Sequence, residues 1–196
     1  MTRVPCKTCG VAILSDTAAR NDGKCVPCRS GTRQNIEPAK KWHREQRERE
    51  RTDPLRRLWR DLVTRARETP NGFASFSEPE QHYFAVGLLE GEVYNGGFDQ
   101  YFFNSSGDHY RYAVEGLEAM GAPQALGLLR QAKQVVFGFD EPERDTERRR
   151  AFLRSSVDES HSKRLNSLDS LFWKDPDSLG AKFEQFAKNR GLVSVA

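Results

Sequence analysis

The chain has 196 residues, 37 % of them hydrophobic and 30 % charged, with 12 Phe, five Tyr and three Trp. This length predicts one ordinary domain with an appendage, and the aromatic side chains supply enough apolar surface for a core. No run of residues approaches the roughly 20 apolar positions that a membrane-spanning helix needs. Together with cysteines of the metal-binding type, this composition leads us to expect a cytoplasmic protein.

The net charge of +3 hides two parts of opposite sign. Residues 1–69 carry 17 Lys and Arg against 9 Asp and Glu, whereas residues 70–196 carry 14 against 19. The stretch 73–129 holds eight acids and a single base, Arg111. Either these acids are a solvated surface that is balanced by bases elsewhere, or they form a surface that attracts a basic partner and repels nucleic acid.

The four cysteines form two Cys-x-x-Cys pairs that are separated by fifteen residues. Two residues between paired thiolates let both sulfurs reach one ion from a tight turn, and zinc takes four such ligands in a tetrahedron. Two disulfides in a secreted protein would use the same residues, but Met1–Pro5 lacks the apolar core of a signal peptide. We predict a module over residues 1–30 with a short strand in 11–14, a hairpin turn at 21–23 and a structural zinc site. Its ligands are Cys6, Cys9, Cys25 and Cys28.

A polar linker, residues 31–52, is expected next. Residues 30–38 show no apolar periodicity, whereas residues 39–51 are strong helix formers with Glu and Arg at helical spacing. The predicted helix has almost no apolar face, so a core cannot hold it. It is either a solvated spacer or a docking element for something acidic.

From Asp53 the pattern predicts a compact all-α domain that extends to residue 196. Asp53 is a candidate N-cap with Pro54 at the first helical position, and apolar residues then recur at helical spacing up to Ala66. A capping box at Ser77–Glu80 opens the next helix. Further helices are predicted over about 108–120, 123–138, 143–156, 160–172 and 176–191, and no strand is expected after residue 30.

The densest local feature is the segment 90–107, in which Asn95-Gly96-Gly97 breaks a helix and Asn104–Gly107 forms a turn. In one interpretation this is a corner whose Phe98, Tyr101 and Phe102 fill the core while polar side chains bond orphaned helix-end groups. In the other, the amides and carboxylates form a recognition pocket. The motif residues are Asn95, Gly96, Gly97, Gln100 and Asn104.

The run Glu-x-Tyr-Asn-Gly-Gly-Phe-x-Gln-Tyr-Phe-x-Asn-Ser-Ser-Gly, which begins at Glu92, is followed by a helix that ends in Met120-Gly121-Ala122. Over about residues 54–192 the chain thereby resembles the C-terminal domain family of bacterial DNA-mimic proteins. The resemblance implies a helical domain that presents acidic side chains in place of DNA phosphates to a DNA-binding protein. The acidic stretch 73–129 agrees with this, whereas the basic run 148–150 and the zinc module depart from it.

The sequence contains no P-loop, no dinucleotide glycine pattern and no Gly-x-Ser-x-Gly elbow, and its four histidines lack metal or triad spacing. We therefore predict a non-enzymatic binding protein that contacts a basic protein, a DNA-binding protein being one candidate. The residues expected to contact this partner are Glu90, Glu92, Asp99, Asp108, Glu115 and Glu118.

The alternative is a nucleic-acid-binding protein that acts through the zinc module and a basic helix over residues 40–67. This segment carries eleven bases against five acids. The interleaved Glu residues interrupt a positive track, and a solvated linker with ion pairs at i, i+4 explains that interleaving.

Overall fold

The computed structural model describes residues 2–194, apart from the side chain of Glu37. The chain divides into two compact units, residues 1–53 and 54–196. We describe each unit by itself.

The first unit begins with two short antiparallel strands, β1 (Arg3–Pro5) and β2 (Ala12–Leu14), paired so that Arg3 lies opposite Leu14. The helices α1 (Ser15–Arg20) and α2 (Val26–Arg29) follow. The prediction of a hairpin turn at 21–23 is wrong, because these residues follow the end of α1 and do not join two strands. The Gly23 N–H donates to the Ala18 carbonyl at 2.7 Å, with positive φ at Gly23.

The long helix of this unit, α3 (Arg33–Thr52), starts six residues before the predicted start at Ala39. Most of the segment 30–38 is helical, and Pro38 lies inside α3. From Ala39 to Thr52 every side chain is exposed except the half-buried Gln46. Apolar periodicity reports a buried face, so a helix that buries nothing gives no such signal.

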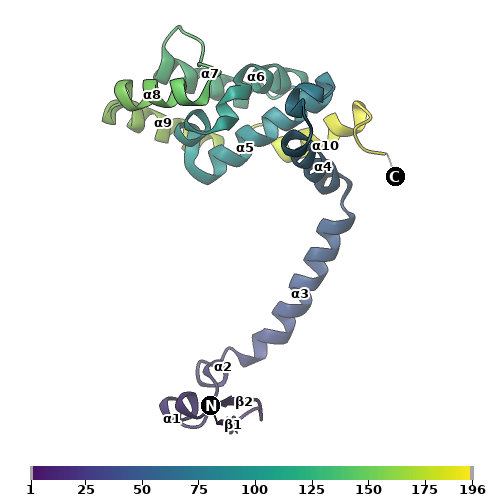
Figure 1. The fold of residues 1–196 in the computed structure, drawn as a ribbon, viewed down its shortest axis with the longest axis vertical. Coiled ribbons are helices and arrows are strands. Elements are labelled where there is room, and N and C mark those ends of the chain that lie inside the picture. The colour runs from purple at the N-terminus through teal and green to yellow at the C-terminus, as the bar shows by residue number, and fades with distance from the viewer. Residues whose placement is uncertain (1, 195–196) are drawn as a thin grey trace. The chain divides into compact units, whose positions relative to one another are not determined.

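The second unit is all-α, as predicted (Figure 1). Its α-helices are α4 (Pro54–Glu68), α5 (Glu78–Phe103), α6 (Tyr110–Ala119), α7 (Pro123–Phe137), α8 (Thr146–Ser156), α9 (Glu159–Phe172) and α10 (Leu179–Asn189). Two 3₁₀ turns, η1 (Gly72–Ser75) and η2 (Ser105–His109), precede α5 and α6. Among residues 2–194 no strand occurs after Leu14. The basic segment 40–67 is therefore two helices, in different units, and not one.

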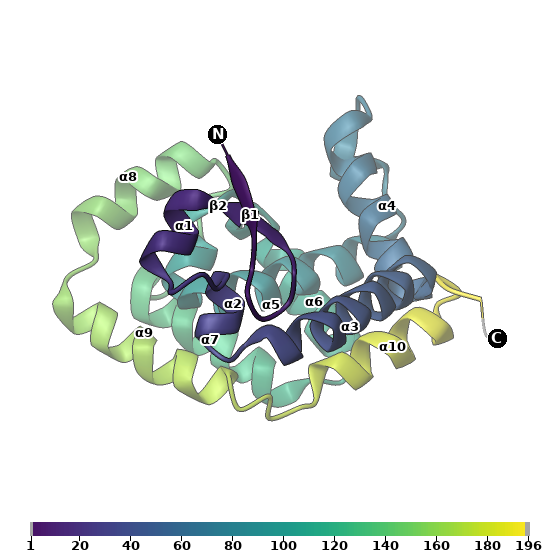
Figure 2. The same ribbon diagram turned by 90° about the horizontal axis from the view of Figure 1, so that it is seen from below.

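Helix α5 is the centre of the second unit and packs against α4, α6, α8, α9 and α10. Figure 2 shows α9 and α10 following one another along one side of the unit. The predicted capping box at the start of α5 is present, since the Ser77 N–H donates to the Glu80 carboxylate at 2.8 Å. Phe98, Tyr101 and Phe102 are fully buried, as the corner interpretation predicted. None of the described helices is both long and apolar enough to cross a bilayer.

Candidate metal centre and the polar motif

The four cysteines meet at one point in the first unit. Their sulfur atoms all lie within 4.8 Å of one another, all four are free thiols, and the Cys9 and Cys25 sulfurs are 3.7 Å apart. A tetrahedral ion with metal–sulfur bonds of about 2.3 Å holds its sulfurs about 3.8 Å apart. The geometry therefore fits a closed four-thiolate metal site.

Two turns of the backbone hold the cysteines in place. In the first turn the Gly10 N–H donates to the Cys6 carbonyl at 2.9 Å, and Gly10 has φ +72°. The second pair lies at the start of α2, where the Cys25 N–H donates to the Cys6 sulfur at 3.2 Å. This bond joins the two turns directly and favours the thiolate form of Cys6.

The electrostatics of the cysteine cluster suit a cation. The N–H of Cys25 is the main cause that lowers the pKa of the Cys6 thiol to about 6. Burial, followed by the neighbouring thiols, raises the pKa of the Cys28 thiol to about 12. The cluster thus stabilises one thiolate unaided, and a bound cation would neutralise the repulsion that opposes further ionisation.

In the second unit, the motif forms a break inside α5. Gly97 has φ +82° and ψ −179°, and Gly96 also departs from helical geometry. A Cβ atom on Gly97 would lie 2.3 Å from the Asp169 Oδ2 atom. Gly97 is therefore required both for its backbone conformation and for the close approach of this carboxylate.

Two side chains at the end of α9 bind the backbone on either side of the break. In a regular helix the Phe98 N–H would donate to the carbonyl four residues earlier, but here it donates to the Asp169 Oδ1 atom at 2.8 Å. The Val93 carbonyl accepts a hydrogen bond from the Trp173 indole N–H at 2.8 Å. Sequence reasoning missed both residues. Asp169 could have been found, because it shares a helix face with the buried Leu165 and Phe172.

The amides of the motif surround one carboxylate, that of Glu92. Its Oε2 atom accepts from Gln100 at 2.6 Å and from Asn104 at 2.9 Å, and its Oε1 atom accepts from Ser106 at 2.8 Å. These bonds span the break and the turn that follows α5. The polar residues Glu92, Gln100 and Asn104 therefore bind one another, as the corner interpretation expects, whereas Asn95 is exposed.

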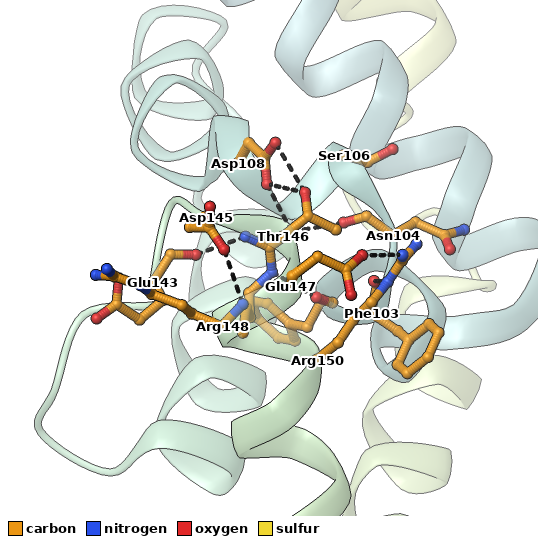
Figure 3. A network of polar contacts seen from close by, with 12 residues as sticks. Phe103, Asn104, Ser106, Asp108, Glu143, Asp145, Thr146, Glu147, Arg148 and Arg150 are labelled. Carbon is orange, nitrogen blue, oxygen red and sulfur yellow. Dashed lines mark hydrogen bonds and ion pairs between the residues drawn. The ribbon is translucent and has the colours of Figure 1, made fainter.

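The basic run 148–150 also serves the motif. The Arg149 side chain is fully buried and donates to the carbonyls of Phe102 (2.6 Å) and Asn104 (2.7 Å) at the end of α5. It also forms a 2.7 Å ion pair with Asp108. Arg150 donates to the Phe103 carbonyl at 2.9 Å. Figure 3 shows Arg150 of α8 beside Phe103 at the end of α5, where cations are favoured.

The other residues expected to contact a partner lie in varied surroundings. Asp99 is exposed, and Glu90 is half-buried, with its pKa raised first by burial and then by nearby Asp175. Glu115 pairs with Arg111 at 2.8 Å, and Glu118 pairs with Arg130. The structure does not bring the six predicted carboxylates together as one free acidic surface.

The four histidines each contact a neighbouring side chain. His82 is buried with its Nε2 atom 3.6 Å from Glu115, and His109 packs against Phe73. His43 packs against Trp42. His161 and Asp158, 2.7 Å apart, belong to the cap of α9. These contacts place the histidines in separate structural surroundings.

The fold and the motif define the second unit as a helical domain built around a broken central helix, clamped by side chains from α8 and α9. A comparison with protein families matches residues 74–190 to the model described as DMP19-like protein, and the chain belongs to this family. The match includes the whole of α5 and its clamp. Comparisons with curated proteins and with solved structures gave no match.

Proposed function

We propose that the protein is a non-enzymatic binding protein whose helical unit contacts a basic surface on another protein. The membership of the DMP19-like family supports a domain of this kind. The resemblance to DNA-mimic proteins suggests a DNA-binding protein as the partner. Glu92 and Asp108 already form hydrogen bonds or an ion pair inside the unit, so fewer of the predicted carboxylates are free to bind such a partner.

The observation that carries the proposal is the loop between α7 and α8. Phe139 at its tip is 95 % exposed, the largest exposure among the exposed large hydrophobic residues. An exposed Phe side chain gains favourable free energy when its apolar surface is removed from water. Insertion of Phe139 into an apolar pocket of a partner would supply this free energy to binding. The loop also carries four exposed carboxylates, those of Asp140, Glu141, Glu143 and Asp145.

Hydrogen bonds from the body of the unit anchor the backbone on either side of Phe139. The Lys133 ammonium donates to the carbonyls of Gly138 and Asp140, each at 3.2 Å, and the Asp140 N–H donates to the Phe137 carbonyl at 3.1 Å. Little conformational entropy is then lost when Phe139 meets a partner. A loop with an exposed aromatic side chain and four carboxylates against one base, Arg144, fits an apolar pocket rimmed by Lys and Arg.

An open cleft of about 500 Å³ adjoins the loop, and its charged lining consists of three acids and three bases: Asp108, Glu115, Glu141, Arg111, Arg130 and Arg144. Two of the six residues expected to contact the partner therefore face the same recess as the loop. Asp99 remains the exposed member of the predicted set with no ion pair to a described residue.

The test is a capture experiment from the native host with the full-length tagged protein, followed by mass spectrometry. The variants are Phe139→Ser and the triple change Asp140→Asn, Glu141→Gln and Glu143→Gln. A matched triple control neutralises exposed carboxylates elsewhere in the second unit, Glu68→Gln, Glu159→Gln and Glu184→Gln. We expect a basic partner that the wild type and the control retain, that both loop variants lose, and that dissociates as salt rises.

Retention of every partner by both loop variants would contradict the contact surface. A partner that survives 500 mM salt and has no basic face would contradict the charge complementarity. Conversion of a small molecule by the purified protein would contradict the non-enzymatic role.

For the first unit we propose that the ion held by Cys6, Cys9, Cys25 and Cys28 is zinc and that its role is structural. Tetrahedral four-sulfur sites suit zinc or iron. With all four positions filled by protein, no position is left for a substrate.

A further inference from the structure

Four exposed cations of α3 lie on one face of the helix. Lys40, Arg44, Arg47 and Arg51 follow one another at spacings of four, three and four residues, all after Pro38. On a helix of 3.6 residues per turn, these spacings confine the four side chains to an arc of about 60°. This face contains no acid of residues 39–52, whereas the other two cations of that stretch, Lys41 and Arg49, lie outside it.

The acids of the same stretch lie away from this face. By the same geometry, Glu45 lies about 130° and Glu50 about 90° from the centre of the basic arc, and Glu48 flanks its edge. Arg51 pairs with Glu48 at 2.8 Å, and both side chains are more than half exposed. Solvent screens such an exposed pair and leaves it weak, so a phosphate can replace the glutamate.

An ion-paired spacer explains only part of this pattern. Among side chains that the structure describes, α3 contains the Arg51–Glu48 pair and a long Lys41–Glu45 contact of 3.9 Å. Arg44 and Arg47, in the middle of the basic face, form no ion pair with a described side chain. A spacer that needed only internal ion pairs would leave these two cations unexplained.

We propose that the face of α3 formed by Lys40, Arg44, Arg47 and Arg51 binds the phosphate backbone of duplex nucleic acid. The face is about 16 Å long, and its rigid row of cations matches a regular row of phosphates better than a flexible acidic segment. A four-thiolate zinc site carries a net double negative charge. The metal centre therefore does not supply the phosphate contacts, and α3 supplies them.

This inference goes beyond the function proposed for the helical unit, and it is tested separately. The full-length protein is titrated with a 20-base-pair DNA duplex between 50 and 200 mM salt. Four phosphate contacts predict a slope of about −3.6 for log K against log salt, which is a loss of roughly 150-fold in affinity over this range. The variant Arg44→Gln/Arg47→Gln should reduce the slope by about 1.8.

The chain offers a matched control on the same helix. Lys41→Gln/Arg49→Gln removes the same charge from positions outside the basic face, and circular dichroism checks that both variants keep α3. We expect the control to keep most of the wild-type slope. Equal losses in the two variants would overturn the proposal, because binding would then depend only on total charge.

Two further outcomes would also overturn it. One is the absence of duplex binding by the wild type at 50 mM salt. The other is displacement of the duplex by polyglutamate at equal charge concentration, which would make an acidic protein segment the better ligand.

Discussion

Asp169 and Trp173 lie one turn apart at the end of α9 and bind the backbone on both sides of the break in α5, through the Phe98 N–H and the Val93 carbonyl. Buried backbone groups that lose their helical partners must find others, because an unpaired buried donor or acceptor costs free energy. Specific hydrogen bonds therefore stabilise the break, and substitutions of the residues that form it should change the stability of the unit.

Replacement of Gly97 by Val should destabilise the helical unit. The positive φ alone costs about 1–3 kcal/mol for a non-glycine residue, and the new Cβ atom would displace the Asp169 carboxylate. Thermal or urea unfolding measures the loss. The control is Gly91→Ala in the same helix, where a Cβ atom meets nothing within 4 Å. This change should stabilise α5 by up to about 1 kcal/mol, and equal effects of both changes would contradict a special role for Gly97.

Substitutions of Asp169 separate its hydrogen bond from its charge. Asp169→Ala leaves the buried Phe98 N–H unpaired and should cost about 1–3 kcal/mol of unfolding free energy. Asp169→Asn keeps an oxygen acceptor and should retain more stability than the alanine variant. If the two variants were equally unstable, the bond to Phe98 would not be the source of the effect.

The pH dependence of Asp169 has a defined sign. Burial is the main cause that raises the pKa of this carboxyl, and nearby Asp99 adds to it. A raised folded-state pKa means that the folded protein holds the proton more tightly, so stability falls as pH rises from the unfolded value of about 3.9 through the folded value. The Asp169→Asn variant has no ionisable group at this position, so it does not lose stability in this way as pH rises. In melting curves, the stability of wild type relative to Asp169→Asn should therefore decrease as pH rises above about 4.

The ion pair between Arg65 in α4 and Glu80 in α5 should give stability the opposite pH dependence. Arg65 donates two bonds to Glu80, at 2.6 and 3.2 Å, and they are the main cause that lowers the pKa of Glu80 to about 2. Its stabilisation is present above the unfolded pKa of about 4.3 and is lost as pH falls towards 2.

Glu80→Gln should therefore cost about 1.5–3 kcal/mol at pH 7 and progressively less below pH 4.5. Glu78→Gln, in the same turn of α5 and exposed, is the control and should change stability little at any pH. Melting curves from pH 2 to 7 measure both. A difference between Glu80→Gln and wild type that does not shrink in acid would contradict the assignment.

Removal of the metal should unfold residues 1–30 and leave the second unit intact. The segment is too short to persist on its own core, and the two units are separate in the structure. We expect one zinc per chain by elemental analysis and, after chelation, proteolysis confined to the first unit with an unchanged melting transition of the second. Cys25→Ser should reproduce the chelated state. Metal-free protein with two disulfides by mass would contradict the site.

The local sequence determined the helices of the second unit and the metal-type cysteines. Capping residues and apolar spacing act within a few positions, so Ser77, Glu80 and Pro54 mark helix starts without reference to the rest of the chain. The cysteine spacing is also a local signal for a metal site, because the two cysteines of each pair lie on a single turn of the backbone. Helix α3 extended beyond its expected start because it buries no face that a pattern could report.

The tertiary structure alone decided what the charged side chains do. Glu92 and Asp108 were expected to face a partner, yet Glu92 binds the motif amides and Asp108 binds Arg149. Arg149 lies 41 residues after Asp108 in the sequence, and Asp169 lies 71 residues after Phe98. Charge is visible in a sequence, but its neutralisation depends on contacts between distant segments, which only the packed helices define.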